Sequence, residues 1–162
     1  MDFESLVYRR ILSHYPTGVC VITAMQEGGA PIGMVVGSFT SVSLDPPLVG
    51  FFPDRRSTSW PRIAATNRFC VNILADDQMA LCKRFASRDD DKFRDISHRF
   101  SDAGLPILDG VVAWIDCTVN AVHEAGDHFI ALGEVQALAA GRDARPLVFW
   151  QGGYGHFAPM VG

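Results

Sequence analysis

The sequence predicts a mainly β fold with a few helices, in which short strands form a closed or nearly closed barrel. Short apolar runs alternate with turn residues along the chain, and residues 112–138 alternate with a period of two. Helical spacing is limited to three short segments. Many short antiparallel strands with a few interleaved helices are typical of barrels. Because the chain has no repeat, low-complexity tract or linker, we expect residues 1–162 to form a single domain.

The first expected elements are a helix and a strand. Apolar side chains within residues 3–12, beginning with Phe3, fall on one helical face, and Pro16 closes this helix. A strand is expected over residues 19–24, and it ends at the glycine turn 27–29.

Residues 33–52 are the stretch most informative about a ligand. They predict a strand, a run of hydroxyl residues around Phe39, a corner at Asp45-Pro46-Pro47 and a second strand, because proline fixes its own φ and donates no N–H. Gly33 and Gly37 leave room for close approach to the backbone. Two interpretations stay open: a Ser/Thr-rich strand at a barrel edge, or a cradle for a flat polar ligand.

A short helix and another strand follow. Ser57 or Ser59 is expected to cap a helix that carries Trp60, because serine side chains accept hydrogen bonds from the first helical amides. Residues 69–74 are continuously apolar apart from one asparagine, which predicts a buried strand.

The next segment predicts a helix and then a surface excursion. Asp76 or Asp77 is expected to cap a helix that runs through Phe85. Residues 87–100 are dense in charge, so we expect them to lie on the surface.

The last part of the chain predicts a long hairpin and a short strand. The hairpin covers residues 112–138 and turns at residues 124–127. A strand over residues 147–150 leads to a glycine-rich segment around Tyr154. That segment is expected to be a turn, with a ligand clamp as the alternative.

Composition and charge exclude several classes of function. The chain has 162 residues, of which 48% are hydrophobic and 20% charged, as in ordinary globular proteins. A net charge of −4 without a basic cluster argues against a nucleic-acid surface. No apolar run approaches the roughly 20 residues of a membrane helix, and the N-terminal segment lacks the features of a signal peptide. We therefore expect a cytoplasmic protein with no membrane or nucleic-acid partner.

The cysteines and histidines do not form a recognisable metal motif. The four cysteines lie far apart among apolar neighbours, where a free thiol behaves as a small hydrophobe. The five histidines show no ligand spacing. The sequence therefore predicts core packing for the cysteines and no metal site.

The motifs that usually carry chemistry are missing as well. The chain has no G-x-G-x-x-G after a strand, no P-loop, no G-x-S-x-G elbow and no H-E-x-x-H. If the chain is an enzyme, we expect a borrowed cofactor to supply the chemistry while the protein supplies position and electrostatics.

Residues 52–59, FPDRRSTS, form a candidate phosphate loop. Two arginines and three hydroxyls lie beside an expected helix N-terminus, and such amides and guanidinium groups bind phosphate. Pro53, Arg55, Ser57 and Thr58 are the candidate residues of this loop. The alternative is a solvated loop with a serine cap.

His128 and the end of the second predicted helix are further candidates. His128 follows the hairpin turn, so it is expected at the mouth of the barrel, where it is either a surface residue or a ligand contact. Phe85 and Ala86 end a helix and are read locally as a core aromatic and a helix end.

An ordered set of motifs resembles the flavin reductase family, which has the FMN-binding split-barrel fold. The matching segments are HYPTGV (14–19), GMVVGSF (33–39), SLDPP (43–47), FCVNIL (69–74), RFA (84–86), DKF (91–93), GDH (126–128), GEV (133–135) and PL (146–147). The resemblance covers residues 3–157. Within the family, the chain is similar to the small reductase components of two-component aromatic monooxygenases.

The resemblance implies a split β-barrel homodimer that binds FMN or FAD near the subunit interface. It implies that hydride passes from NADH or NADPH to this flavin and that reduced flavin then leaves for a separate monooxygenase. The apolar side chains of Phe149, Trp150 and Trp114 are candidates for the dimer contact.

The resemblance also assigns site residues. The implied flavin contacts are Met34, Val35, Val36, Ser38, Phe39, Arg55, Ser57, Thr58, Phe85 and Ala86, and His128 is implied to lie beside the nicotinamide. Gly37 and Met34 depart from the residues common in the family, so the choice between FMN and FAD stays open.

The function expected from the sequence is therefore that of an NAD(P)H:flavin oxidoreductase. Two alternatives stay open: a non-catalytic flavin- or haem-binding split-barrel carrier or sensor, and a tight flavoprotein that reduces another acceptor.

Overall fold

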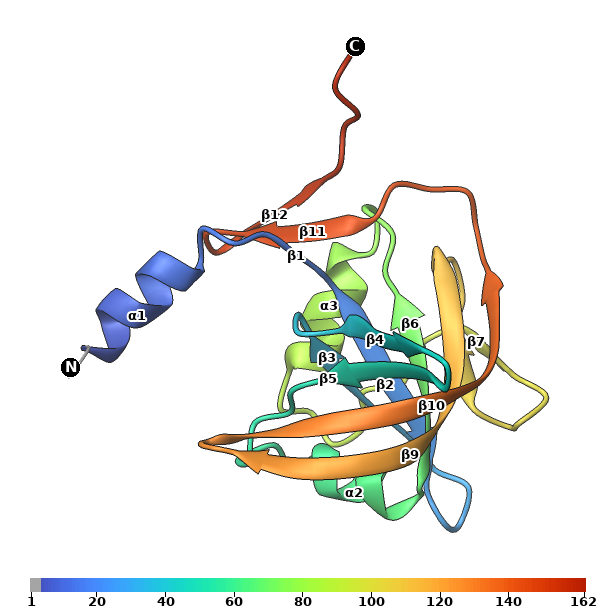
Figure 1. The fold of residues 1–162 in the computed structure, drawn as a ribbon. Helices are drawn as coiled ribbons and strands as arrows, with labels where there is room; N and C mark the ends of the chain where they lie inside the picture. Colours follow the sequence, from blue (N-terminus) through green and yellow to red (C-terminus); the bar gives the residue numbers. More distant parts are fainter. Residues whose placement is uncertain (1–3) are drawn as a thin grey trace.

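The computed structural model describes residues 4–162 and is mainly β with three short helices (Figure 1). Phe3, the first expected helical residue, lies outside the described residues. The helices are α1 (Ser5–Leu12), α2 (Trp60–Ala65) and α3 (Met79–Ala86). The strands are β1 (Thr17–Gly18), β2 (Cys20–Met25), β3 (Pro31–Val36), β4 (Thr40–Leu44), β5 (Pro47–Phe51), β6 (Arg68–Ile73), β7 (His98–Phe100), β8 (Pro106–Leu108), β9 (Ala113–Ala125), β10 (His128–Ala140), β11 (Leu147–Trp150) and β12 (Gly153–His156).

A seven-stranded antiparallel sheet forms the body of the molecule. Its strand order is β3-β2-β6-β9-β10-β5-β4. The two edge strands, β3 and β4, follow one another in the chain and are separated by residues 37–39 alone. Within residues 4–162 no strand ladder joins these two edges.

Both faces of the sheet are buried, which explains the continuous apolar runs of β2 and β6. Phe69 and Val71 face a core cluster with Phe51, Trp60 and Ile63, whereas Cys70 faces a second cluster under α3. The ring of Phe51 meets Trp60 and Phe69 edge-on, with centroids 5.4 and 5.3 Å apart. Burial of each such side chain contributes about 1.5–3 kcal/mol of transfer free energy.

Gly133 on β10 makes room for this core. A Cβ atom added there would overlap the ring of Phe69 and touch Cys117 Cβ at 3.0 Å. The glycine therefore lets β10 lie directly over the aromatic side chain of β6.

A buried polar group attaches the β7–β8 hairpin to the second face of the sheet. The Asn72 Oδ1 atom accepts from the Leu108 amide at 2.8 Å, and the Thr23 hydroxyl donates to the Pro106 carbonyl at 2.5 Å. These bonds satisfy side chains that are otherwise costly to bury. They also explain the lone asparagine in the apolar run of β6.

The predicted role of the cysteines in the core is confirmed. All four are buried free thiols. Burial raises the pKa of the Cys20 thiol to about 12. Burial, followed by the charge of Asp116, raises the pKa of the Cys117 thiol to about 12. The thiols of Cys20 and Cys117 are therefore neutral, and all four cysteines pack as small hydrophobes.

The predicted helices and hairpin are present, with corrections at their ends. Ser59 is the N-cap residue of α2, but the Ser57 hydroxyl accepts from the Trp60 amide at 3.1 Å. The cap predicted for α3 at Asp76 or Asp77 is wrong. Gln78 is the N-cap residue, and Asp77 instead pairs with Arg142, which follows the end of β10.

Two segments differ from the predicted turn and surface excursion. The glycine-rich segment after β11 is not only a turn, because Gly153–His156 forms β12 and the turn is confined to Gln151 and Gly152. Within residues 87–100, Phe93 is buried and meets Phe85 edge-on at 5.1 Å. An aromatic anchor therefore holds the charged segment to the core.

A projecting arm consists of α1, β1, β11 and β12, and Figure 1 shows it extending away from the body. Trp150 Nε1 donates to the His14 carbonyl at 2.9 Å, and the Gln151 amide donates to the Ser13 carbonyl at 3.1 Å. These bonds tie the end of α1 to the β11–β12 hairpin. Among the described residues, none of α1 is buried, and Leu6 is 77% exposed. The apolar face of α1 thus does not pack on the core of its own chain.

Within residues 4–162, none of the helices is long and apolar enough to cross a membrane.

Candidate functional site

A hollow of about 620 Å³ brings together six of the predicted site residues, and we call it the basic hollow. It lies between β3, the start of α2, the end of α3 and the segment that follows α3. The predicted residues on its wall are Met34, Val35, Ser57, Thr58, Phe85 and Ala86. Its volume lies within the range of small-molecule and cofactor pockets, roughly 300–1,000 Å³.

Four cations on this wall were not predicted as site residues. They are Arg56, Arg62, Arg88 and Lys92, and Asp90 is the one carboxylate beside them. Arg56 could have been found from its place beside Arg55 in the candidate phosphate loop. The other three lie in segments read as a helix and a charged surface, so only the fold brings them together.

The Arg56 side chain is held by a neighbouring carboxylate. Its guanidinium contacts Asp54 at 2.9 and 3.2 Å, and its amide donates to the same carboxylate at 2.7 Å. These hydrogen bonds, followed by the Arg56 charge, lower the pKa of Asp54 to about 2. The carboxylate is therefore ionised at neutral pH and fixes the turn that carries Arg56.

Lys92 joins the two helices that border the basic hollow. Its Nζ donates to the Phe85 carbonyl at 3.0 Å and to the Ser59 hydroxyl at 3.4 Å. Burial, followed by the charge of Arg62, lowers the pKa of Lys92. An ammonium has three protons to donate, so the side chain can make one further bond to an anion in the hollow.

The opposite part of the basic hollow is apolar and is positioned by Gly33. A Cβ atom at this position would lie 2.6 Å from Phe85 Cε1, so only glycine lets α3 approach β3 this closely. The close approach places Phe85 and Ala86 beside Met34 and Val35 on the same wall.

Arg55 lies away from the wall of the basic hollow, at the tip of the β9–β10 hairpin. It forms an ion pair with Glu124, donates to the Gly126 carbonyl at 3.3 Å and lies over the Phe129 ring at 5.2 Å. Pro53 is buried next to it, and its carbonyl accepts from the Phe129 amide at 2.9 Å. The predicted role of Arg55 in phosphate binding stays a prediction, and its contacts here join the loop to the hairpin.

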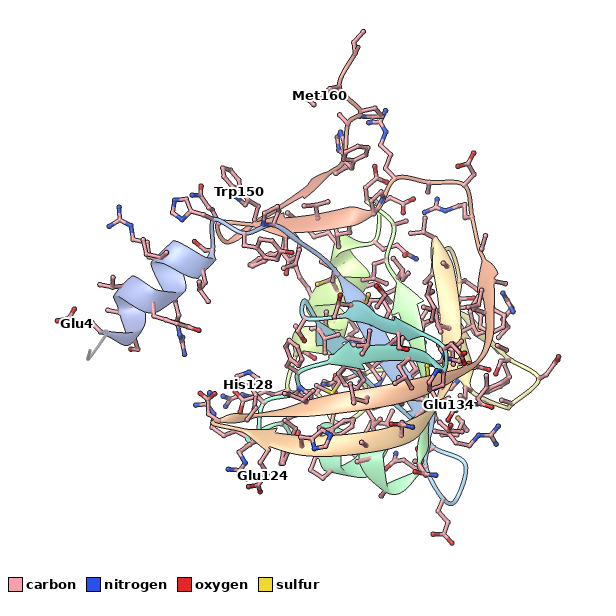
Figure 2. The ribbon with its side chains drawn as sticks, in the orientation of Figure 1. Glu4, Glu124, His128, Glu134, Trp150 and Met160 are labelled. Atoms are coloured by element: carbon pink, nitrogen blue, oxygen red, sulfur yellow. The ribbon has the colours of Figure 1, made fainter. Side chains whose placement is uncertain are left out.

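His128 and Ser38 line a second hollow of about 490 Å³, which we call the His128 hollow. His128 begins β10 beside the hairpin turn, as predicted, and Figure 2 shows it near Glu124 at the hairpin tip. The other lining residues come from α1, the end of β5 and the hairpin: Tyr8, Leu12, Phe52, Ala125, Phe129 and Ile130.

Asp127 sets the hydrogen-bonding character of the His128 ring. The Nδ1 atom lies 2.7 Å from the Asp127 carboxylate. An ionised carboxylate can only accept, so Nδ1 carries the proton and a neutral ring presents Nε2 as an acceptor. The hydrogen bond to His128 lowers the pKa of Asp127, which keeps this carboxylate ionised.

Residues 52–59 connect the two hollows. Phe52 lines the His128 hollow, and Ser57 to Ser59 line the basic hollow. Between them, Asp54 pairs with His128 in an isolated β-bridge. The Ser38 hydroxyl accepts from the Phe52 amide at 2.9 Å, which leaves its own proton to donate.

The remaining predicted residues line a third, smaller hollow or pack in the core. Val36 and Tyr154 line a smaller hollow of about 200 Å³, and Val35 lines both this hollow and the basic hollow. The Cys82 thiol donates to the Tyr154 hydroxyl at 3.4 Å. Phe39 packs against the core cluster around Phe51.

The basic hollow fits an amphipathic anion. Its hydroxyls and cations suit phosphate, whereas Met34, Val35 and Phe85 suit a flat apolar ring. Within the described residues no group of three or more histidine, cysteine or acidic side chains is placed to hold a metal ion. The hydroxyls, cations and apolar wall of the basic hollow can bind and orient a phosphate-bearing ring system.

The comparisons with known proteins agree with this fit. The family model described as a flavin reductase-like domain matches residues 12–158. The flavin reductase of Pseudomonas putida is 57% identical over 153 residues, which cover 94% of this chain and 90% of the relative. The reductase subunit HsaB of a flavin-dependent monooxygenase from Rhodococcus jostii is 45% identical, with 94% and 77% covered.

A solved structure of a flavin-reducing enzyme has the same fold as this chain. The Streptomyces globisporus NADH:FAD oxidoreductase SgcE6, in complex with NAD and FAD fragments, superposes with a TM-score of 0.92 at 33% identity. The superposition covers 100% of this chain and 98% of that chain.

Proposed function

The chain belongs to the flavin reductase-like domain family, and we propose on this basis that it uses NADH or NADPH to reduce FMN or FAD. The relatives named as monooxygenase reductase subunits support a separate monooxygenase as the recipient of the reduced flavin. The observation that carries the proposal is the basic hollow, in which hydroxyls and four cations lie beside an apolar wall.

The residues of the basic hollow hold the flavin by its two unlike ends. Ser57, Thr58 and Lys92 would hydrogen-bond the phosphate, and the arginine charges would attract it. Met34, Val35 and Phe85 exclude water from the ring. When bound, the flavin supplies the acceptor for a hydride from the nicotinamide.

His128 orients the nicotinamide in the second hollow. Its Nε2 atom accepts a hydrogen bond from the carboxamide NH₂ group, because Nδ1 is already bonded to Asp127. Ser38 lines the same hollow and retains a proton that can be donated to the carboxamide oxygen. The protein acts by proximity, since these contacts fix a ring without transferring a proton.

We further propose a split barrel that forms a homodimer in the cytoplasm. The consecutive edge strands β3 and β4 support a split barrel, because both edges lie close together in the chain. The exposed apolar face of α1 and the exposed Trp150 and Phe149 support the dimer. Trp114 is half-buried and remains a candidate for the contact. The free thiols are consistent with a reducing compartment.

A steady-state assay tests the proposed reaction. Purified protein is mixed with NADH or NADPH, and nicotinamide absorbance is followed with and without added FMN, FAD or riboflavin. The proposal predicts consumption that depends on both protein and flavin. A protein that binds flavin without increasing consumption would instead be the carrier or sensor left open by the sequence.

A further inference from the structure

The segment between α3 and β7 has no helix or strand in residues 87–97, yet it contributes to the basic hollow. Arg88, Asp90 and Lys92 lie on the wall, and they include two of its four cations. A segment without regular structure needs other contacts to hold its charged side chains in place, because each ordered residue loses conformational entropy.

Arg84, in the last turn of α3, provides these contacts. Its guanidinium donates to the carbonyls of Asp91, Lys92 and Arg94, each at 3.3 Å. It also lies 3.7 Å from the Asp89 carboxylate. One half-buried side chain thus contacts four residues of the segment.

The other contacts of the segment are spread over several side chains and backbone groups. Phe93 is anchored beside Phe85, and the Asp91 amide donates to Asp89 at 3.0 Å. The Lys92 side chain is bonded to the Phe85 carbonyl and the Ser59 hydroxyl, and the Arg94 amide donates to the Asp91 carbonyl at 3.4 Å. The bonds to the carbonyls of Lys92 and Arg94 come from Arg84. A planar guanidinium with five donors can satisfy several carbonyls together, whereas a lysine ammonium offers three donors from one point.

Arg84 itself is not on the wall of the basic hollow. We propose that Arg84 is a positioning residue, which fixes the segment 87–95 so that Arg88 and Lys92 face the phosphate of the bound flavin. The inference rests on the proposed function, because it takes the phosphate-bearing flavin as the ligand of the basic hollow.

The test compares Arg84→Ala and Arg84→Lys with Arg94→Ala in the full-length protein. Arg94 lies in the same segment and pairs with Asp91 at 3.4 Å, so its loss removes the same charge without removing a donor to the segment's carbonyls. Flavin fluorescence quenching measures the binding of FMN, FAD and riboflavin. Limited trypsin digestion measures exposure of the peptide bonds after Arg88 and Lys92.

Both Arg84 variants are expected to bind FMN and FAD roughly tenfold more weakly, because charged hydrogen bonds to phosphate are lost. Riboflavin, which has no phosphate, is expected to bind as it does to the wild type. Cleavage after Arg88 and Lys92 is expected to become faster in both Arg84 variants but not in Arg94→Ala, which keeps both of these sites. Millimolar guanidinium is expected to restore part of the FMN affinity of Arg84→Ala.

The outcomes separate this inference from the proposed function. Failure of the wild-type protein to bind or reduce any flavin would overturn the proposed function. Wild-type binding with unchanged FMN affinity in both Arg84 variants would overturn the role of Arg84 alone. Equal loss of riboflavin affinity, or a large fall in the melting temperature of both variants, would also overturn it, because Arg84 would then support the whole fold.

Discussion

At the scale of single residues, His128 is the side chain that separates nicotinamide binding from flavin binding. It lies in a hollow of its own, and Asp127 holds its Nδ1 atom at 2.7 Å. We expect His128→Ala to lower kcat/KM for NADH by the equivalent of about 1–3 kcal/mol, the effect of one lost polar contact. Steady-state kinetics and flavin fluorescence quenching on one preparation measure the two functions.

His123→Ala is the matched control, because His123 is an exposed histidine on the neighbouring strand β9. Flavin affinity and stability are expected to change by no more than ~0.5 kcal/mol in either variant. If His128→Ala binds flavin more weakly but reduces it with NADH at the wild-type rate, His128 contacts the flavin and not the nicotinamide.

Asp116 carries a stability prediction at the same scale. Its side chain is 2% exposed, and within residues 4–162 its Oδ1 atom has no hydrogen-bond partner. A buried polar oxygen without a partner is costly, so Asp116→Asn is expected to raise the free energy of unfolding by about 1 kcal/mol. Urea denaturation measures this change, with the exposed Asp143→Asn as control. A loss of stability in Asp116→Asn would mean that the carboxylate has a partner in solution.

At the scale of elements, the Cys82–Tyr154 bond joins α3 to strand β12 of the arm. The interaction with the Cys82 side chain, followed by burial, raises the pKa of Tyr154 from 10.0 to about 12. Because the folded pKa is the higher one, the contribution of Tyr154 to stability is present below pH 10 and is lost as the pH rises through about 12.

Tyrosinate absorbance tests this shift. The difference between wild-type and Tyr154→Phe titrations isolates one hydroxyl and is expected to have a midpoint near pH 12. A midpoint near pH 10 would show that β12 does not hold Tyr154 against α3 in solution.

Secondary-structure elements with a regular apolar period were predictable from the sequence. The long hairpin and the strand at residues 69–74 were found because alternation and continuous burial leave distinct patterns. The N-cap of α3 was not found, because Asp77 had a distant partner, Arg142, that no local pattern shows. β12 was missed because glycine residues favoured a turn reading.

The candidate site, too, was only partly predictable from the sequence. Ser57, Thr58 and Phe85 were identified and share one hollow, whereas Arg62, Arg88 and Lys92 were missed. Their charges resembled those of a solvated surface, and only the packing of α2 against the segment 87–95 reveals that they converge. Neighbours in sequence also diverge, because Arg56 faces the basic hollow while Arg55 pairs with Glu124.

At the scale of the whole molecule, the exposed arm predicts that two copies of the chain associate. Ile11 is 61% exposed on a helix that, in the described part of the chain, has no buried residue. If α1 packs on a second copy, Ile11→Glu is expected to shift the protein from dimer to monomer without unfolding the body. Light scattering at micromolar concentration measures the mass.

Arg9→Glu, on the polar side of the same helix, is the control and is expected to stay dimeric. A wild-type protein with the mass of one chain would contradict the dimer. An unchanged dimer in Ile11→Glu would exclude α1 from the interface.

The central claim is that this protein transfers hydride from a nicotinamide to a flavin. Anaerobic stopped-flow absorbance with protein, FMN or FAD, and either NADH or NADH deuterated at C4 measures that step directly. The account predicts that flavin bleaching requires the protein, slows on deuteration and slows further in His128→Ala. Bleaching at the same rate with and without the protein, for every flavin and nicotinamide, would contradict it.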